Sequence, residues 1–211
     1  GARWLAIDPH AEAHGLAVVR RAQHQVQVAC LEAVGDAPQR ARPAAFTVAL
    51  RLPGWCRIPQ LAVNGEAVAP AVRRGYAYLT RTWQAGDVVT LTLPMPVERV
   101  ETHPHARMNA GKVALQRGPV VYCLEQVDNG PNLADLLLPR AAALTAEYRP
   151  DLLGGVVAIR ATAQRRSLDG WDDCLYRLDR SAMEPVEITA VPYCLWNNRG
   201  DGEMTVWLKE G

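Results

Sequence analysis

The chain has 211 residues, enough for one large domain or two small ones, and its 49% hydrophobic and 21% charged residues are ordinary globular usage. This composition excludes disordered, collagenous and coiled-coil proteins, and no apolar run approaches the roughly 18 residues of a membrane-spanning helix. There are 23 basic and 22 acidic residues, and the basic ones are scattered arginines apart from Lys112 and Lys209. We therefore expect a soluble protein with neither a nucleic-acid nor a membrane partner.

The first half of the chain shows hydrophobic residues with period two, the pattern of half-buried strands. The predicted strands are 26–30, 46–52, 61–63, 66–68, 76–80 and 89–93. Asn64-Gly65 lies between two of them and is typical of a type I′ hairpin turn, because both residues tolerate positive φ. Gly86 marks a second turn.

The alternation stops between Val97 and Met108, where Pro104 interrupts the chain. We therefore predict a domain junction at residues 103–105, with a first domain over 1–102 and a second over 106–211.

The second half again favours strands over helices. The predicted strands are 112–116, 120–124, 156–161, 175–178, 186–193 and 204–208. Only Leu133 to Ala146 has helical character, and Pro139 limits it to a turn or two. Short strands with turns about every ten residues predict an all-β fold class: two antiparallel, jelly-roll-like β-sandwich domains in tandem, with little helix.

Two polar groups are candidates for chemistry. The first holds Glu98, Glu101, His103 and His105, types that bind metals or transfer protons, but its place in the predicted junction favours a solvated linker. The second is Asp172-Asp173, where a turn with solvated acids is favoured, because adjacent carboxylates on a strand point to opposite faces.

Aromatic residues offer a candidate contact surface. Six Trp and six Tyr accompany one Phe, and flat rings with polar handles suit sugar stacking as well as the edge of a sandwich core. Trp55, Trp83 and Trp196 lie beside turns, so they are the candidate carbohydrate or docking contacts. Trp55 follows a Pro-Gly turn at a strand end, where it either serves a neighbouring domain or folds back over its own core.

The five cysteines lack metal-finger or disulfide-framework spacing. They are Cys30, Cys56, Cys123, Cys174 and Cys194. Each lies among apolar neighbours, as a buried small hydrophobe would, and at least one thiol must remain unpaired within the chain. The pattern is compatible with a cytoplasmic protein and with a periplasmic or secreted one. Recognisable catalytic or phosphate-binding motifs are absent from the sequence.

Four segments together resemble the C-terminal part of bacterial glycoside hydrolase family 127, the β-L-arabinofuranosidases. They are RLPGWCRIPQLAVNGEAV (51–68), GYAYLTRTWQAGDVVTLTLPMPVE (75–98), NAGKVALQRGPVVYCLEQVDNG (109–130) and TAVPYCLWNNRGDGEMTVWL (189–208). The resemblance implies that two β-sandwiches follow an (α/α)6 barrel that carries the active site. The four segments fall in the sandwiches.

The resemblance also implies that the catalytic groups lie in the barrel: a zinc-bound cysteine thiolate as nucleophile and a glutamate as acid/base. The barrel contains an adjacent Cys-Cys pair that this sequence lacks. No catalytic, cofactor-binding or metal residue is therefore carried over, zinc is expected in the barrel alone, and the chain is expected to be an inactive piece of a longer enzyme.

The leading hypothesis is a non-catalytic region that supports the barrel as its intramolecular partner, with a homodimer contact left open. The alternative is a carbohydrate-binding module for arabinan or glycoprotein glycans. A small hydrolase in its own right ranks last.

Overall fold

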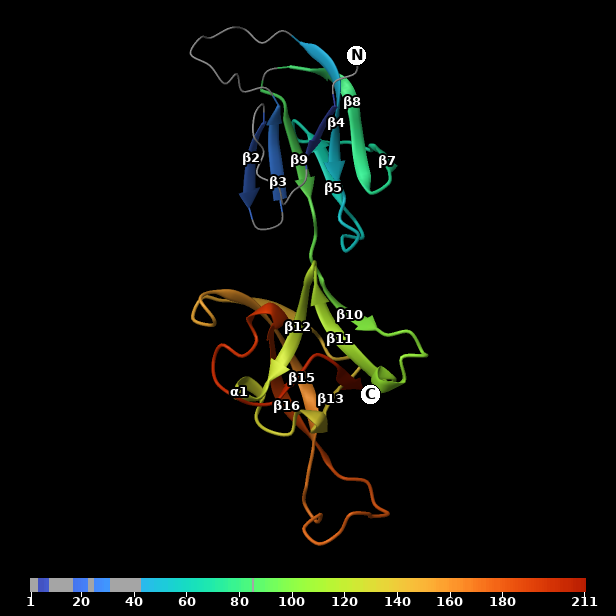
Figure 1. Cartoon of the computed structure of the whole chain (residues 1–211), viewed down its shortest axis with the longest axis vertical. Coiled ribbons are helices and arrows are strands. Elements are labelled where there is room, and N and C mark those ends of the chain that lie inside the picture. The colour runs from blue at the N-terminus through green and yellow to red at the C-terminus, as the bar shows by residue number, and fades with distance from the viewer. Residues whose placement is uncertain (1–3, 8–16, 23–24, 31–42, 85) are drawn as a thin grey trace. The chain divides into compact units, whose positions relative to one another are not determined.

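The computed structural model describes residues 4–7, 17–22, 25–30, 43–84 and 86–211 (Figure 1). It is built mainly of strands, and the described residues contain one α-helix, α1 (Gln126–Asn129), and three 3-10 helices. The predicted all-β class with little helix is confirmed. No helix among the described residues is both long and apolar enough to cross a membrane. Contacts divide the chain into two units, Gly1–Met95 and Pro96–Gly211.

The first unit contains two sheets. A four-stranded sheet has the order β1 (Trp4–Ile7), β4 (Ala44–Arg51), β8 (Tyr76–Trp83) and β7 (Ala71–Arg73). A five-stranded sheet has the order β2 (Ala17–Ala22), β3 (Gln25–Cys30), β9 (Val88–Thr92), β5 (Gln60–Val63) and β6 (Glu66–Ala67). All pairs are antiparallel except β1 with β4.

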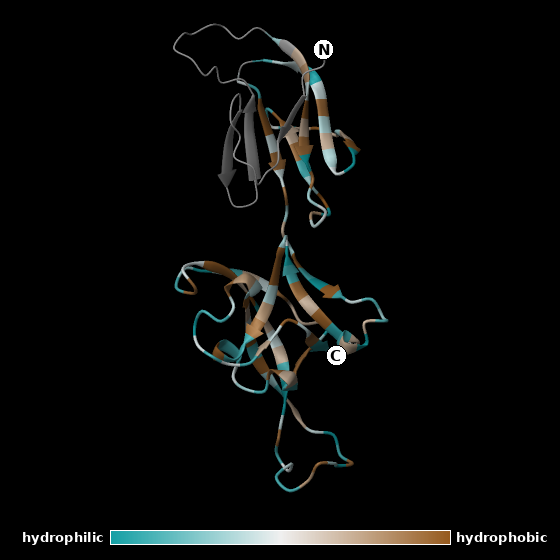
Figure 2. Ribbon diagram, in the orientation of Figure 1, coloured by the Kyte–Doolittle hydropathy of each residue, from teal (hydrophilic) through white to brown (hydrophobic). Residues whose placement is uncertain are grey.

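Both sheets of the first unit contribute to one core. Val48 and Leu50 of β4 pack in the same cluster as Val89 and Leu91 of β9. The hydrophobic positions alternate with more polar ones along these strands, as Figure 2 shows. The period-two pattern of the sequence therefore follows from strands with one buried face.

The Asn64-Gly65 turn has the predicted geometry, with φ of 54° and 85°. Asp87 fixes this turn to the chain before β9. Its carboxylate accepts hydrogen bonds from Asn64 Nδ2 at 2.8 Å and from the Gln84 amide at 2.9 Å. These bonds hold the pKa of Asp87 below its ordinary value, because they favour the charged carboxylate.

The second unit forms one nine-stranded sheet. Its order is β10 (Val97–Glu101), β11 (Lys112–Arg117), β18 (Leu208–Glu210), β13 (Leu136–Leu138), β15 (Val156–Arg166), β16 (Met183–Pro192), β12 (Val120–Glu125) and β17 (Met204–Thr205), with β14 (Thr145–Arg149) on β15. Because β12 also pairs with β11, the pairings from β11 through β18, β13, β15 and β16 return to β11. The tandem-sandwich detail of the prediction is not confirmed.

Several predicted boundaries differ from the structure. Residues 97–101 form β10, whose side chains are mostly half-buried, so a lapse in alternation there did not mark a linker. Residues 103–105 lie in the β10–β11 connection, whereas the contacts divide the chain at Met95 and Pro96. Residues 175–178 are a loop, because their apolar side chains are exposed rather than buried in a sheet.

Candidate functional site

The three predicted contact residues have different environments. Trp83 is fully buried, and its Nε1 donates to the Phe46 carbonyl at 3.1 Å, so its ring is not open to a ligand or a neighbouring domain. Trp55 is half-buried and packs against the core of its own unit. Trp196 is 40% exposed and remains available for contact.

Trp196 forms an exposed aromatic ledge with Tyr193, which sequence reasoning did not single out. The two rings are stacked, with centroids 6.2 Å apart and planes inclined by 11°. Tyr193, which is 45% exposed, begins the 3-10 helix Tyr193–Leu195 after β16, and Trp196 directly follows that helix. In the sequence, this pair could have been found from its three-residue spacing, because a 3-10 turn places residues with that spacing on one side.

Arg199 anchors the loop that carries the ledge. Its guanidinium makes a bidentate pair with Asp128, at 2.6 Å for Nη1, and its Nη2 also donates to Glu125. Glu125 in turn accepts a hydrogen bond from the Asn197 amide at 3.1 Å. The two carboxylates raise the pKa of Arg199, so the group stays charged.

Four cysteine side chains lie among the described residues, that of Cys30 lies outside them, and only two of the four are buried as the sequence led us to expect. Cys56 and Cys123 are buried in different units, whereas Cys174 and Cys194 are exposed. Burial, reinforced by Glu125, raises the pKa of Cys123 to about 12, which keeps it a thiol. Across the described residues, no three His, Cys, Asp or Glu side chains are grouped to hold a metal ion.

The two polar groups predicted as candidates also lie apart from any such cluster. His103 and His105 are exposed in the β10–β11 connection, with ring centroids 4.8 Å apart in an edge-on contact. Asp172 and Asp173 are exposed in a turn, as predicted. The two histidines and the two aspartates are therefore exposed to solvent, whereas Glu98 and Glu101 belong to strand β10 and not to the predicted linker.

A loop over residues 167–182, with four aspartates and two arginines, joins β15 to β16 (Figure 1). Trp171 holds it together: its Nε1 donates to Ser181 Oγ at 3.0 Å, and the Arg177 guanidinium lies 5.4 Å from the centre of its ring. Three large side chains face solvent, at 86% exposure for Leu175, 90% for Tyr176 and 104% for Leu178. The loop thus exposes apolar side chains between its charged residues.

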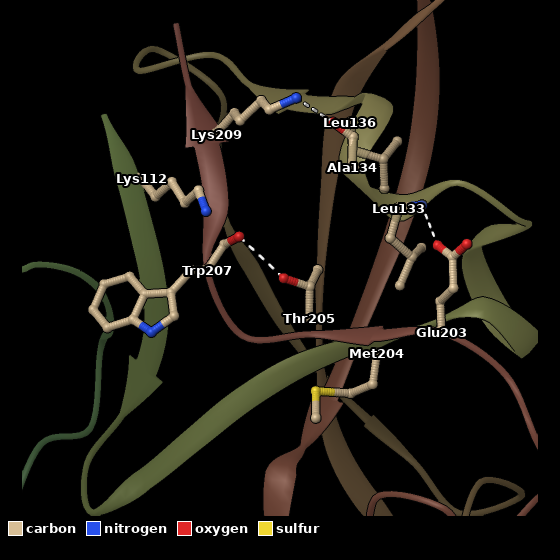
Figure 3. Close-up of a pocket in the computed structure, with 9 residues that line it drawn as sticks. All are labelled: Lys112, Leu133, Ala134, Leu136, Glu203, Met204, Thr205, Trp207 and Lys209. Carbon is tan, nitrogen blue, oxygen red and sulfur yellow. Dashed lines mark hydrogen bonds between the residues drawn. The ribbon is translucent and has the colours of Figure 1, made fainter. Parts of the chain in front are cut away.

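A pocket of ≈ 320 Å³ lies beside β11, β17 and β18 (Figure 3). Leu133, Ala134 and Leu136 line one side, and the two lysines of the chain extend from β11 and β18 on the other. Lys209 Nζ donates to the Ala134 carbonyl at 2.5 Å. The pocket thus combines an apolar wall with two cations and one carboxylate, that of Glu203.

Two family descriptions match the chain in succession. Residues 17–95 match the beta-L-arabinofuranosidase GH127 middle domain, and residues 97–209 match the glycoside hydrolase family 127 C-terminal domain. The chain belongs to glycoside hydrolase family 127. The boundary between the matches coincides with the division of the GH127 chain into two units.

Relatives of this GH127 chain are named as arabinofuranosidases. It is 37% identical over 180 residues to a non-reducing end beta-L-arabinofuranosidase of Bifidobacterium longum, covering 82% of this chain and 27% of that protein. The crystal structure of a GH127 beta-L-arabinofuranosidase from Geobacillus stearothermophilus T6 matches with a TM-score of 0.79 and 46% identity, over 92% of this chain and 32% of that one. A further solved GH127 beta-arabinofuranosidase matches with a TM-score of 0.78 and 29% identity, over 92% and 31%. This chain thus spans about a third or less of these relatives.

Proposed function

We propose that this chain is the non-catalytic β-strand region of a GH127 enzyme that hydrolyses β-L-arabinofuranosides, and that it supports the catalytic part of that enzyme. The observation that carries the proposal is the pair of family matches, to a middle and a C-terminal domain, within relatives about three times as long. The raised pKa of Cys123 supports it, because a thiolate nucleophile needs an environment that lowers the pKa of its thiol.

The direct test is an assay of the purified chain with nitrophenyl β-L-arabinofuranoside, together with elemental analysis for zinc. We expect no turnover and no stoichiometric zinc. A second experiment mixes this chain with the separately expressed catalytic part of a full-length GH127 homologue. We expect the chain to raise the melting temperature of that catalytic part. Turnover by the chain alone, or one zinc per chain, would refute the non-catalytic assignment.

The loop 167–182 is the surface that we assign to this support. Leu175, Tyr176 and Leu178 expose apolar area that an inter-domain contact, typically about 600–1,500 Å², would cover. Replacing all three with Ser should abolish the stabilising effect on the catalytic part. Serine replacement of Val72, which is 57% exposed in the first unit, is the control. Concentration-dependent self-association lost only in the loop variant would instead identify a homodimer contact and overturn this assignment.

A second candidate function is carbohydrate contact, as in a binding module for arabinan or glycoprotein glycans. The specific observation that favours it is the ledge of Tyr193 and Trp196, because two nearly parallel exposed rings offer a flat apolar face to a sugar. Arabino-oligosaccharides should quench tryptophan fluorescence in the native chain and not in Trp196→Ala. Equal quenching in both proteins would exclude the ledge.

A further inference from the structure

The pocket in Figure 3 brings together the only two lysines of an arginine-rich chain. Lys112 and Lys209 are directly opposite in the antiparallel pairing of β11 with β18. Their neighbours Val113 and Leu208 are buried, at 1% and 4% exposure, so the lysines lie on the other face of the sheet. Directly opposite residues have Cβ atoms about 4.5–5.5 Å apart, so the two side chains leave the sheet together, and the Lys209 ammonium extends to the Ala134 carbonyl.

No carboxylate of the described residues forms an ion pair with either lysine. Glu203, which lines the pocket, instead accepts a hydrogen bond from the Leu133 amide at 2.7 Å. Glu210 pairs with Arg99 at 3.0 Å and with Arg140 at 3.1 Å. Like charges directly opposite on a sheet repel, so an anion bound between the two lysines would reduce this electrostatic repulsion.

The rest of the lining sets the kind of anion. Leu133, Leu136 and Met204 give the pocket an apolar side, and the Thr205 hydroxyl, which donates to the Trp207 carbonyl at 3.1 Å, keeps lone pairs to accept a hydrogen bond. The Trp207 indole points away from the leucines in Figure 3, so it does not face the apolar side of the pocket. A small molecule with one carboxylate, hydroxyl groups and an apolar C–H face matches these walls.

We propose that this pocket binds a uronate unit of an acidic polysaccharide, with the carboxylate between Lys112 and Lys209. The inference rests on the proposed function, because a region of a glycoside hydrolase meets polysaccharide chains. A volume of ≈ 320 Å³ is at the lower end of ligand pockets, the size expected for a single sugar unit rather than a long oligosaccharide. The pocket would then hold a uronate unit of the substrate polysaccharide while the catalytic part of the enzyme hydrolyses another unit.

The test is calorimetric titration of the chain with galacturonic acid, with galactose as the neutral match and inorganic phosphate as the plain anion. We expect millimolar binding of galacturonic acid, at least about tenfold weaker binding of the other two, and weakening as salt screens the lysines. Lys112→Gln and Lys209→Gln should each weaken galacturonic acid binding about tenfold. Lys112→Arg should largely keep it, and Arg107→Gln, at an exposed position of the same unit, should have no effect.

Three outcomes would overturn the proposal: binding unchanged in both glutamine variants, phosphate bound as tightly as galacturonic acid, or polyglutamate bound equally well. The last would assign the pocket to an acidic peptide. Lys209 is exposed and Lys112 is half-buried, and neither belongs to the hydrophobic core, so circular dichroism of the glutamine variants should match that of the native chain. Because the titration uses the chain alone, it measures uronate binding independently of whether the chain supports a catalytic partner.

Discussion

Replacing Arg199 with Met should destabilise the second unit far more than an ordinary surface change. The side chains of Glu125 and Asp128 are only 5% and 16% exposed, and Arg199 itself is 18% exposed. Removing one partner of a buried ion pair costs about 3–5 kcal/mol, because the remaining charge is left without compensation. The partial exposure of Asp128 favours the lower end, near 3 kcal/mol, or roughly 12 °C in Tm for a unit of this size.

The assay is urea unfolding followed by circular dichroism, with scanning calorimetry for Tm. Arg140→Met is the matched control, since Arg140 is 76% exposed and its partner Glu210 keeps Arg99, so the loss should stay below about 1 kcal/mol. Adding Glu125→Gln to Arg199→Met should restore part of the stability by removing the unpaired charge. Equal losses in the Arg199 and Arg140 variants, or no gain in the double variant, would refute this reasoning.

Three other results are expected. Gly65→Val should lower the free energy of unfolding by about 1–3 kcal/mol through backbone strain alone, because φ is +85° and a Cβ there meets nothing within 4 Å, whereas Gly54→Val, without positive φ, should have a smaller effect in the same urea titration. Because the pKa of Asp87 is lowered by folding, its carboxylate stabilises the fold at pH values above the unfolded-state pKa of about 3.9, and this contribution is lost as the pH falls through the folded-state pKa. The difference in free energy of unfolding between the native protein and Asp87→Asn should therefore narrow below about pH 4 in an acid titration. In maleimide labelling followed by mass spectrometry, the exposed Cys174 and Cys194 should react in the native state, and the buried Cys56 and Cys123 only after unfolding. Labelling of Cys123 in the native state would contradict its raised pKa.

The parts of the fold that the sequence predicts are those with a local cause. Alternation marks β9 because each second side chain enters the core, and Asn64-Gly65 specifies a turn through its own φ preferences. Residues 175–178 misled the same reasoning, since their apolar side chains serve a surface rather than a core. A period-two pattern reports hydrophobicity, and only the packed structure shows whether a face is covered.

The candidate sites depend on partners that are distant in sequence. Glu125 and Arg199 are brought together by the return of the chain after β16, and Lys112 meets Lys209 only through the pairing of β11 with β18. The burial of Trp83 likewise depends on the sheet that faces it. No local spacing encodes such pairs, so they could not be found without the tertiary pairing of the strands.

The surfaces with candidate functions belong mainly to the second unit, and its topology explains why. There the pairings of β11, β18, β13, β15, β16 and β12 form a closed ring, so each of these strands has a paired strand on both sides for part of its length. The connections at the ring's ends are then free to differ in length and chemistry without cost to the core. The loop 167–182 and the ledge loop are two such connections, each braced by its own arginine, Arg177 and Arg199. A connection held in this way presents its exposed side chains in a fixed geometry. Less conformational entropy is then lost when a partner binds, so such a connection is better suited to binding than a flexible one.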